Sequence, residues 1–211
     1  MIPKVKICGL RDAAAARLAA DCGADLLGFI TFPRSPSHLE PEVFRTFAGD
    51  LPPVPKVSVR VRPSLEELLA DRDDFDFFQI HFPLETPEEE IAAWSKILTP
   101  AALWLAPKLP PGVPFPEHLL SLAETIFIDT YRPDKYGGTG ETGDWKRFAA
   151  LRERWPEKRW ILAGGLNPDN VASAVRATGA SWIDLKSGVE SETGVKDPAK
   201  LRALFANLRN G

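Results

Sequence analysis

Cysteine and methionine are scarce in this chain of 211 residues, which has two of the first and one of the second. Two thiols in a chain of this size, without a recognisable secretory signal, do not indicate a disulfide framework. We therefore expect reduced cysteines and a cytoplasmic location. The sequence also lacks any run of about eighteen apolar residues, so it predicts no membrane-spanning helix.

Long runs of one charge are also absent, and the formal net charge is −3. Nothing in this balance favours a nucleic-acid or membrane partner. Hydrophobic residues make up 44% of the chain and charged residues 26%, a composition typical of a folded globular protein. The length suits one domain over residues 1–211, and the 20 prolines are spread along the chain, where they mark loops.

Short apolar runs alternate with helical patterns along the whole chain. The predicted strands are Val5–Cys8, Leu26–Thr31, Lys56–Val61, Phe75–His81, Ala102–Ala106, Thr125–Asp129, Trp160–Ala163 and Trp182–Lys186. The predicted helices are Asp12–Asp21, Pro41–Ala48, Ser64–Ala70, Pro87–Leu98, Glu117–Ala123, Trp145–Arg154, Pro168–Ala177 and Pro198–Asn207. Eight such pairs favour a single-domain α/β fold, the (β/α)8 TIM barrel. A doubly wound open sheet is the alternative, but it usually has fewer strands and a glycine fingerprint that "CGLRD" lacks.

Two residues with reactive side chains stand at the ends of predicted strands, where barrel enzymes carry their active sites. By alternation, Cys8 shares the inward face with Lys6, and Asp129 shares it with Phe127. A thiol with a lowered pKa can act as a base, and a buried carboxyl with a raised pKa can act as an acid. The alternative for Cys8 is a buried thiol that only packs in the core.

Glycine-rich turns follow the last two predicted strands. "AGGLNP" contains Gly164 and Gly165, and "LKSGVE" contains Lys186, Ser187 and Gly188. The loops after strands seven and eight are the usual phosphate site of such barrels, because glycine lets backbone N–H groups approach the phosphate oxygens. We expect these residues to bind a phosphate, with Lys186 as a point charge.

Six motifs in order resemble the phosphoribosylanthranilate isomerase family of tryptophan biosynthesis: "KICGLRD", "GADLLGF", "FQIH", "DT…YGGTG…DW", "ILAGGLNPDNV" and "DLKSGVES…GVKD". The resemblance implies an Amadori rearrangement of N-(5-phosphoribosyl)anthranilate, with Cys8 as general base and Asp129 as general acid. It implies no metal or other cofactor, and a small phosphorylated substrate. We expect Gln79, His81, Gly138 and Asp184 to line the pocket, in a monomer or a homodimer.

The sequence departs from the family pattern at several positions. Ser37 stands where an arginine usually holds the anthranilate carboxylate, so Arg34, Arg60 and Arg62 are candidates for that role. Alternation on the third strand suggests that Arg60 faces the barrel interior. Alternatively, Arg60 pairs with an interior carboxylate such as Asp184.

The other departures are Phe82 in place of glycine, Glu141 in place of lysine or glutamine, and Lys186 in place of a small polar residue. Together they leave a second reading open. In that reading the chain is a barrel enzyme or a binding protein for a different phosphorylated sugar.

Overall fold

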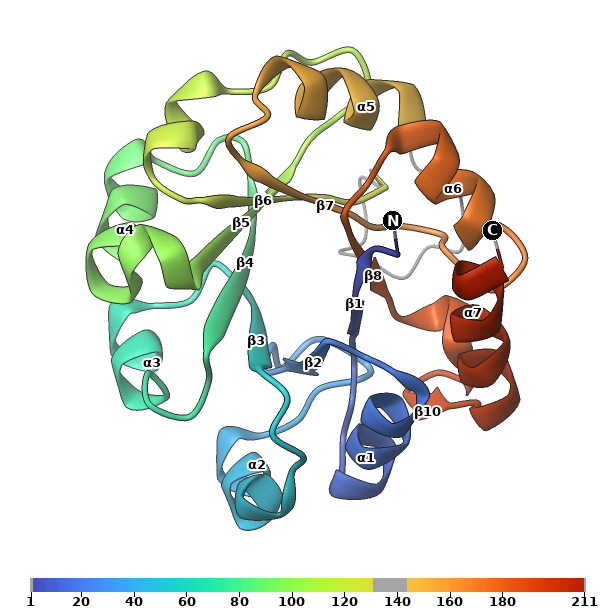
Figure 1. Ribbon diagram of the computed structural model, residues 1–211. Helices are drawn as coiled ribbons and strands as arrows, with labels where there is room; N and C mark the ends of the chain where they lie inside the picture. Colours follow the sequence, from blue (N-terminus) through green and yellow to red (C-terminus); the bar gives the residue numbers. More distant parts are fainter. Residues whose placement is uncertain (1, 131–143, 211) are drawn as a thin grey trace.

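Eight parallel strands close into a barrel, and β1 pairs with both β2 and β8 to complete the ring (Figure 1). The computed structural model describes residues 2–130 and 144–210. The strands are β1 (Lys4–Ile7), β2 (Leu26–Ile30), β3 (Lys56–Val61), β4 (Phe77–Pro83), β5 (Leu103–Lys108), β6 (Thr125–Ile128), β7 (Arg159–Leu162) and β8 (Trp182–Leu185). The prediction of a (β/α)8 barrel is confirmed.

Helices surround the ring and alternate with the strands (Figure 1). They are α1 (Ala13–Cys22), α2 (Pro41–Phe47), α3 (Leu65–Ala70), α4 (Glu88–Ala102), α5 (Trp145–Arg154), α6 (Val171–Thr178) and α7 (Pro198–Asn210). Short 3-10 helices cover Ala48–Asp50, Glu117–Ser121 and Ser187–Val189. After β8 the chain also forms an unpredicted hairpin, β9 (Glu190–Glu192) and β10 (Val195–Lys196).

The region from residue 98 to residue 123 differs from the predicted pattern. Thr99 has φ 66°, which breaks α4 just before Pro100, so the predicted helix end at Leu98 is close to the break. The helix predicted over Glu117–Ala123 is wrong, because only the 3-10 helix Glu117–Ser121 forms there. Pro110, Pro111, Pro114 and Pro116 lie in the first part of the connection between β5 and β6, and proline is disfavoured inside a helix, so only its last part is helical.

Side chains cap some of the helices and not others. Ser64 and Glu67 form a reciprocal capping box at α3, and Asp197 accepts from the backbone at the start of α7. Thr86 precedes Pro87 but makes no capping bond to α4, and its buried hydroxyl has no hydrogen-bond partner among residues 2–130 and 144–210. The chain reaches α4 one residue later, with Pro87 at the cap position.

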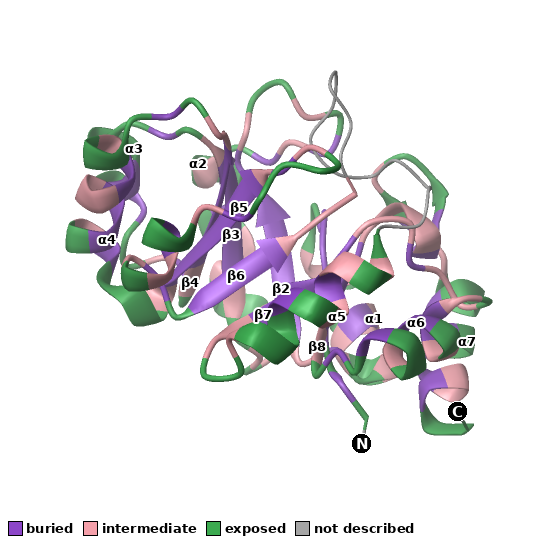
Figure 2. Ribbon diagram, turned by 90° about the horizontal axis from the view of Figure 1, so that it is seen from above, coloured by how far each residue is buried: buried purple, intermediate pink, exposed green. Residues whose placement is uncertain are grey.

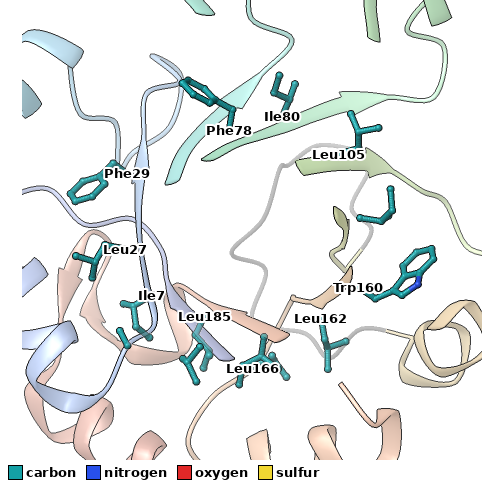
Figure 3. Packing of buried hydrophobic residues seen from close by; sticks show 14 of the residues in the cluster. Ile7, Leu27, Phe29, Phe78, Ile80, Leu105, Trp160, Leu162, Leu166 and Leu185 are labelled. Carbon is teal, nitrogen blue, oxygen red and sulfur yellow. The ribbon is translucent and has the colours of Figure 1, made fainter. Parts of the chain in front are cut away.

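The core has two layers, one on each side of the strands. The outer layer lies between strands and helices, and Figure 3 shows its side chains pointing away from the centre of the barrel. The inner layer fills the barrel and comprises Cys8, Leu26, Ile30, Val57, Val59, Trp104, Ala106, Phe127, Ile161 and Ala163. Because both faces are covered, the strands are buried almost throughout, while exposed residues lie on the outer helix surfaces (Figure 2).

Aromatic side chains fill the barrel near the starts of the strands. The ring of Trp104 lies 5.0 Å from that of Phe77 and 6.3 Å from that of Trp182. Arg159 stacks on Trp182 at 4.7 Å. With this end filled, the open end of the barrel is the one at the carboxyl ends of the strands.

The orientation predicted for β3 is wrong. Val57 and Val59 point into the barrel, so Ser58 and Arg60 point outward, toward the helices. There the Arg60 guanidinium forms a buried ion pair with Asp71, just after α3, and donates to Ser58 Oγ at 3.1 Å. Both faces of a barrel strand are buried, so polarity alone did not identify the inner face.

We expect Asp71→Ala to lower the free energy of unfolding by about 3 kcal/mol, because it leaves the Arg60 charge buried without its carboxylate. Glu117→Ala is the control, since it removes an exposed ion pair with Arg154 and should cost at most about 1 kcal/mol. Urea unfolding of both variants tests this. Equal losses in the two variants would contradict the assignment of a buried pair.

Candidate active site

A cavity of about 580 Å³ opens at the carboxyl ends of the strands. Ten of the residues singled out from the sequence line it: Cys8, Arg34, Gln79, His81, Asp129, Gly164, Gly165, Asp184, Lys186 and Ser187. They come from loops and strands distant in sequence, and the barrel brings them to one end. The cavity is therefore the candidate active site.

Cys8 directly follows β1 and points inward, as predicted. It is a free thiol, only 4% exposed, and it lies on the cavity wall. Burial raises the pKa of the Cys8 thiol, and the charge of Asp184 raises it further; the ammonium groups of Lys6, Lys196 and Lys186 oppose this. The net pKa is above the ordinary value, so most Cys8 side chains are protonated at neutral pH.

Lys6 and Asp184 form a buried ion pair beneath Cys8, with 2.6 Å between Nζ and Oδ1. The two residues are register partners across the β1–β8 seam. Burial alone would lower the pKa of Lys6, but Asp184 and the Cys8 sulfur raise it more, so Lys6 stays charged. A Cβ atom on Gly28 of β2 would lie 2.9 Å from Lys6 Cε, so glycine leaves the space that the lysine stem occupies.

Asp129 directly follows β6 and also lines the cavity. Its Oδ1 accepts a hydrogen bond from the Thr130 N–H at 2.8 Å. Burial, with a further contribution from the charge of Asp184, raises the pKa of Asp129 from 3.8 to about 7. The carboxyl can therefore hold a proton near neutral pH and release it to an acceptor in the cavity.

Gln79 and His81 lie on the inner face of β4, as predicted. Gln79 Nε2 lies 2.7 Å from His81 Nε2. Burial, followed by the charge of Lys6, lowers the pKa of His81 to about 3, so the imidazole is neutral and accepts from the amide. This arrangement fixes the tautomer of His81 and makes it unsuited to act as an acid at neutral pH.

The glycine turns after β7 and β8 pack against each other and against the Asp129 segment. Gly164 has φ 88° and Gly165 has φ 65°. A Cβ atom on Gly164 would lie 2.7 Å from Asp129 Oδ1 and closer still to Thr130. Gly188 packs against the carbonyl of Leu166 and does not line the cavity. The backbone of Gly164, Gly165 and Ser187 thus borders the space near Asp129.

Sequence comparison identifies the family. The family model described as N-(5'-phosphoribosyl)anthranilate (PRA) isomerase matches residues 5–207. The chain belongs to this family. An N-(5'-phosphoribosyl)anthranilate isomerase of Paracoccus denitrificans is 38% identical over 98% of this chain and 97% of its own length.

Solved structures of PRA isomerases share the fold. The Thermus thermophilus enzyme is 34% identical, with a TM-score of 0.81 and 98% of each chain covered. Another structure, 29% identical with a TM-score of 0.78, holds reduced 1-(o-carboxyphenylamino)-1-deoxyribulose 5-phosphate; the match covers 99% of this chain and all of that one. The chain is thus similar along its whole length to enzymes of one activity.

Of the three arginines that could bind the anthranilate carboxylate in place of the arginine missing at position 37, only one lies at the cavity. Arg34, in the loop after β2, lines the cavity. Arg60 and Arg62 do not: Arg60 faces outward, and Arg62 pairs with Glu90 through bonds of 3.0 and 2.7 Å. The partner suggested for Arg60, Asp184, is bound to Lys6 instead.

Of the other departures from the family pattern, Lys186 lines the cavity, whereas Ser37 and Phe82 do not. Ser37 is fully buried and is not among the cavity residues, and Phe82 packs outward against Trp94 with 5.7 Å between ring centroids. Gly138 and Glu141 lie outside the described residues. Sequence reasoning missed the apolar wall formed by Ile30, Phe32, Val59 and Val61, which the valine face of β3 would have indicated.

Neither a metal site nor a membrane span is found in the described parts of the chain. Within residues 2–130 and 144–210, no group of three His, Cys, Asp or Glu side chains is arranged to hold a metal ion. No helix in those ranges is long and apolar enough to cross a membrane.

The raised pKa of Asp129 predicts a pH-dependent stability difference. Folding favours the protonated carboxyl, so its stabilising effect is present below pH 3.8 and is lost as pH rises through about 7. Relative to the wild type, Asp129→Asn should gain about 2 kcal/mol of unfolding free energy between pH 4 and pH 8, a value discounted because the side chain borders the cavity.

Urea unfolding at the two pH values measures this change, with the surface variant Asp73→Asn as control. If the unfolding free energies of the wild type and Asp129→Asn differ by the same amount at both pH values, folding does not shift the pKa of the Asp129 carboxyl.

Proposed function

We propose that this cavity isomerises N-(5'-phosphoribosyl)anthranilate by an acid–base pair, with Asp129 as the acid and Cys8 as the base. One observation carries the proposal: a thiol and a carboxyl with a raised pKa line the same cavity, beside the glycine turns of β7 and β8. The chain belongs to the PRA isomerase family, whose reaction is this aldose–ketose isomerisation.

The reaction needs proton transfers at two atoms that are each bonded to C1, the ring oxygen and C2. Asp129 donates its proton to the ribose ring oxygen, the C1–O bond breaks, and the nitrogen lone pair forms an iminium ion. The positive charge makes the C2 hydrogen acidic, and the Cys8 thiolate removes it to give an enaminol. The enaminol becomes the ketose by gaining a proton at C1 and losing the proton on O2. Proton exchange with water then restores the Cys8 thiolate and the Asp129 acid, so the reaction is an isomerisation with no net redox change.

The two pKa shifts limit how many molecules are ready to react. The reactive form pairs a thiolate at Cys8 with a protonated Asp129, whereas burial raises the pKa of both groups. At neutral pH the carboxyl is in the required form in about half of the molecules, but the thiolate is scarce. Groups that increase the thiolate fraction should therefore increase the rate.

The anionic ends of the substrate have matching groups on the cavity wall. We infer that the phosphate binds against the backbone of Gly164, Gly165 and Ser187, which glycine leaves open to its oxygens. We infer that Arg34 binds the anthranilate carboxylate, since it lines the cavity beside the apolar wall of Phe32 and Ile30. As the sequence suggests, we expect a monomer or a homodimer in the cytoplasm.

Turnover of freshly generated phosphoribosylanthranilate, followed by loss of anthranilate fluorescence, tests the acid–base pair. Cys8→Ser and Asp129→Asn should each lower kcat by at least about 100-fold, because each removes a proton-transfer group. Cys22→Ser is the matched control, since this half-buried thiol at the end of α1 lies away from the cavity. An inactive wild type that still binds phosphate would favour a different phosphorylated sugar as substrate.

The same assay tests Arg34. Arg34→Met should raise KM roughly tenfold while changing kcat less, because a charge-assisted contact to the carboxylate is lost. Arg62→Met is the control and should keep the wild-type KM, as Arg62 does not line the cavity. If KM rises in Arg62→Met and not in Arg34→Met, the anthranilate carboxylate binds to Arg62, after β3, and not to Arg34.

A further inference from the structure

Lys186 immediately follows β8 and lines the cavity, but its stem runs toward β1. A Cβ atom on Gly9 would lie 3.0 Å from Lys186 Cε, 3.3 Å from its Cγ and 3.5 Å from its Cδ. Gly9 is the residue after Cys8. The stem of Lys186 therefore lies across the backbone next to the thiol, over a glycine that leaves room for it.

The other two lysines that act on Cys8 are each held by a carboxylate. Lys6 is bound to Asp184 at 2.6 Å, and Lys196 is bound to Glu190 at 2.7 Å, both in buried pairs. Each of these cations thus acts on the thiol together with a neighbouring anion. Lys186 shows no carboxylate partner within residues 2–130 and 144–210, so its charge acts on the cavity without such compensation.

We propose that Lys186 is a positioning residue of this isomerase, whose ammonium group favours the thiolate form of Cys8. The inference rests on the proposed role of Cys8 as the base. It assigns a reason to a departure from the family pattern, since a lysine stands where a small polar residue is usual. A buried thiol is a poor base, and a cation beside it increases the fraction that is ionised.

Charges from three sides of Cys8 support this role. Burial raises the pKa of the thiol most and Asp184 raises it further, whereas Lys6 from β1, Lys196 from β10 and, as the smallest contribution, Lys186 after β8 lower it. Lys186 also lowers the pKa of Asp129, so its charge reaches both reacting groups. Among the groups that shift the pKa of Asp129, Lys186 contributes least, and the pKa of this carboxyl stays at about 7.

Alkylation of Cys8 by iodoacetamide measures the thiolate without turnover. In a Cys22→Ser background Cys8 is the only thiol, so the rate against pH reports its ionisation. Lys186→Met should move this profile to higher pH and slow alkylation at pH 7.5 roughly three- to tenfold, with kcat reduced to a similar extent. Lys186→Arg should restore most of both, because it keeps the charge.

Arg34→Met is the matched control, because it removes a cation from the same cavity but leaves the surroundings of Cys8 unchanged. Its alkylation profile should match that of the wild type. An unchanged profile in Lys186→Met would overturn the proposal. A raised KM with an unchanged profile would also overturn it and assign Lys186 to the substrate phosphate.

A separate result would show that the proposed function itself is wrong. If Cys8→Ser kept its turnover, Cys8 would not be the base, whatever the alkylation profile of Lys186→Met. Thermal unfolding of each variant identifies any loss of activity that comes from misfolding.

Discussion

The buried ion pair between Lys6 and Asp184 is the constraint around which the open end of the barrel is organised. It joins β1 to β8 where the ring closes, and it lies beneath the thiol of Cys8. Two charges inside a barrel are costly unless they are paired, so neither residue can change alone. Gly28 leaves space for the lysine, and Phe127 faces its ammonium at 5.7 Å. The same pair sets much of the electrostatic field at Cys8, Asp129 and His81.

The fold and the positions of the proposed acid and base could be predicted because they depend on local patterns. Alternation placed Cys8 and Asp129 at strand ends, facing inward, and glycines marked the loops after β7 and β8. The inner face of β3 could not be predicted in this way. Valines point into the barrel and Arg60 points out, and only the position of Asp71 after α3 explains that choice. Such a pairing depends on tertiary contacts that a single strand does not encode.

The cavity combines a reactive end with an apolar wall, and its charges are unevenly distributed. Two buried lysines are neutralised by Asp184 and Glu190, whereas Arg34 and Lys186 line the opening from the loops after β2 and β8, the two strands that flank β1. A substrate that carries both a phosphate and a carboxylate suits these two cations. The aromatic ring between those ends suits the wall of Ile30, Phe32 and Val59.

The close approach of Gly164 to the Asp129 segment limits how this barrel can diversify. Any side chain at position 164 would displace the carboxyl of Asp129 and the backbone of Thr130. Evolution or design cannot reshape the loop after β7 at this position without moving Asp129, the residue after β6. Changes of ligand are easier to accommodate in a loop outside this contact, such as the one after β2. Ser37, where this chain departs from the family pattern, lies in that loop, as does Arg34.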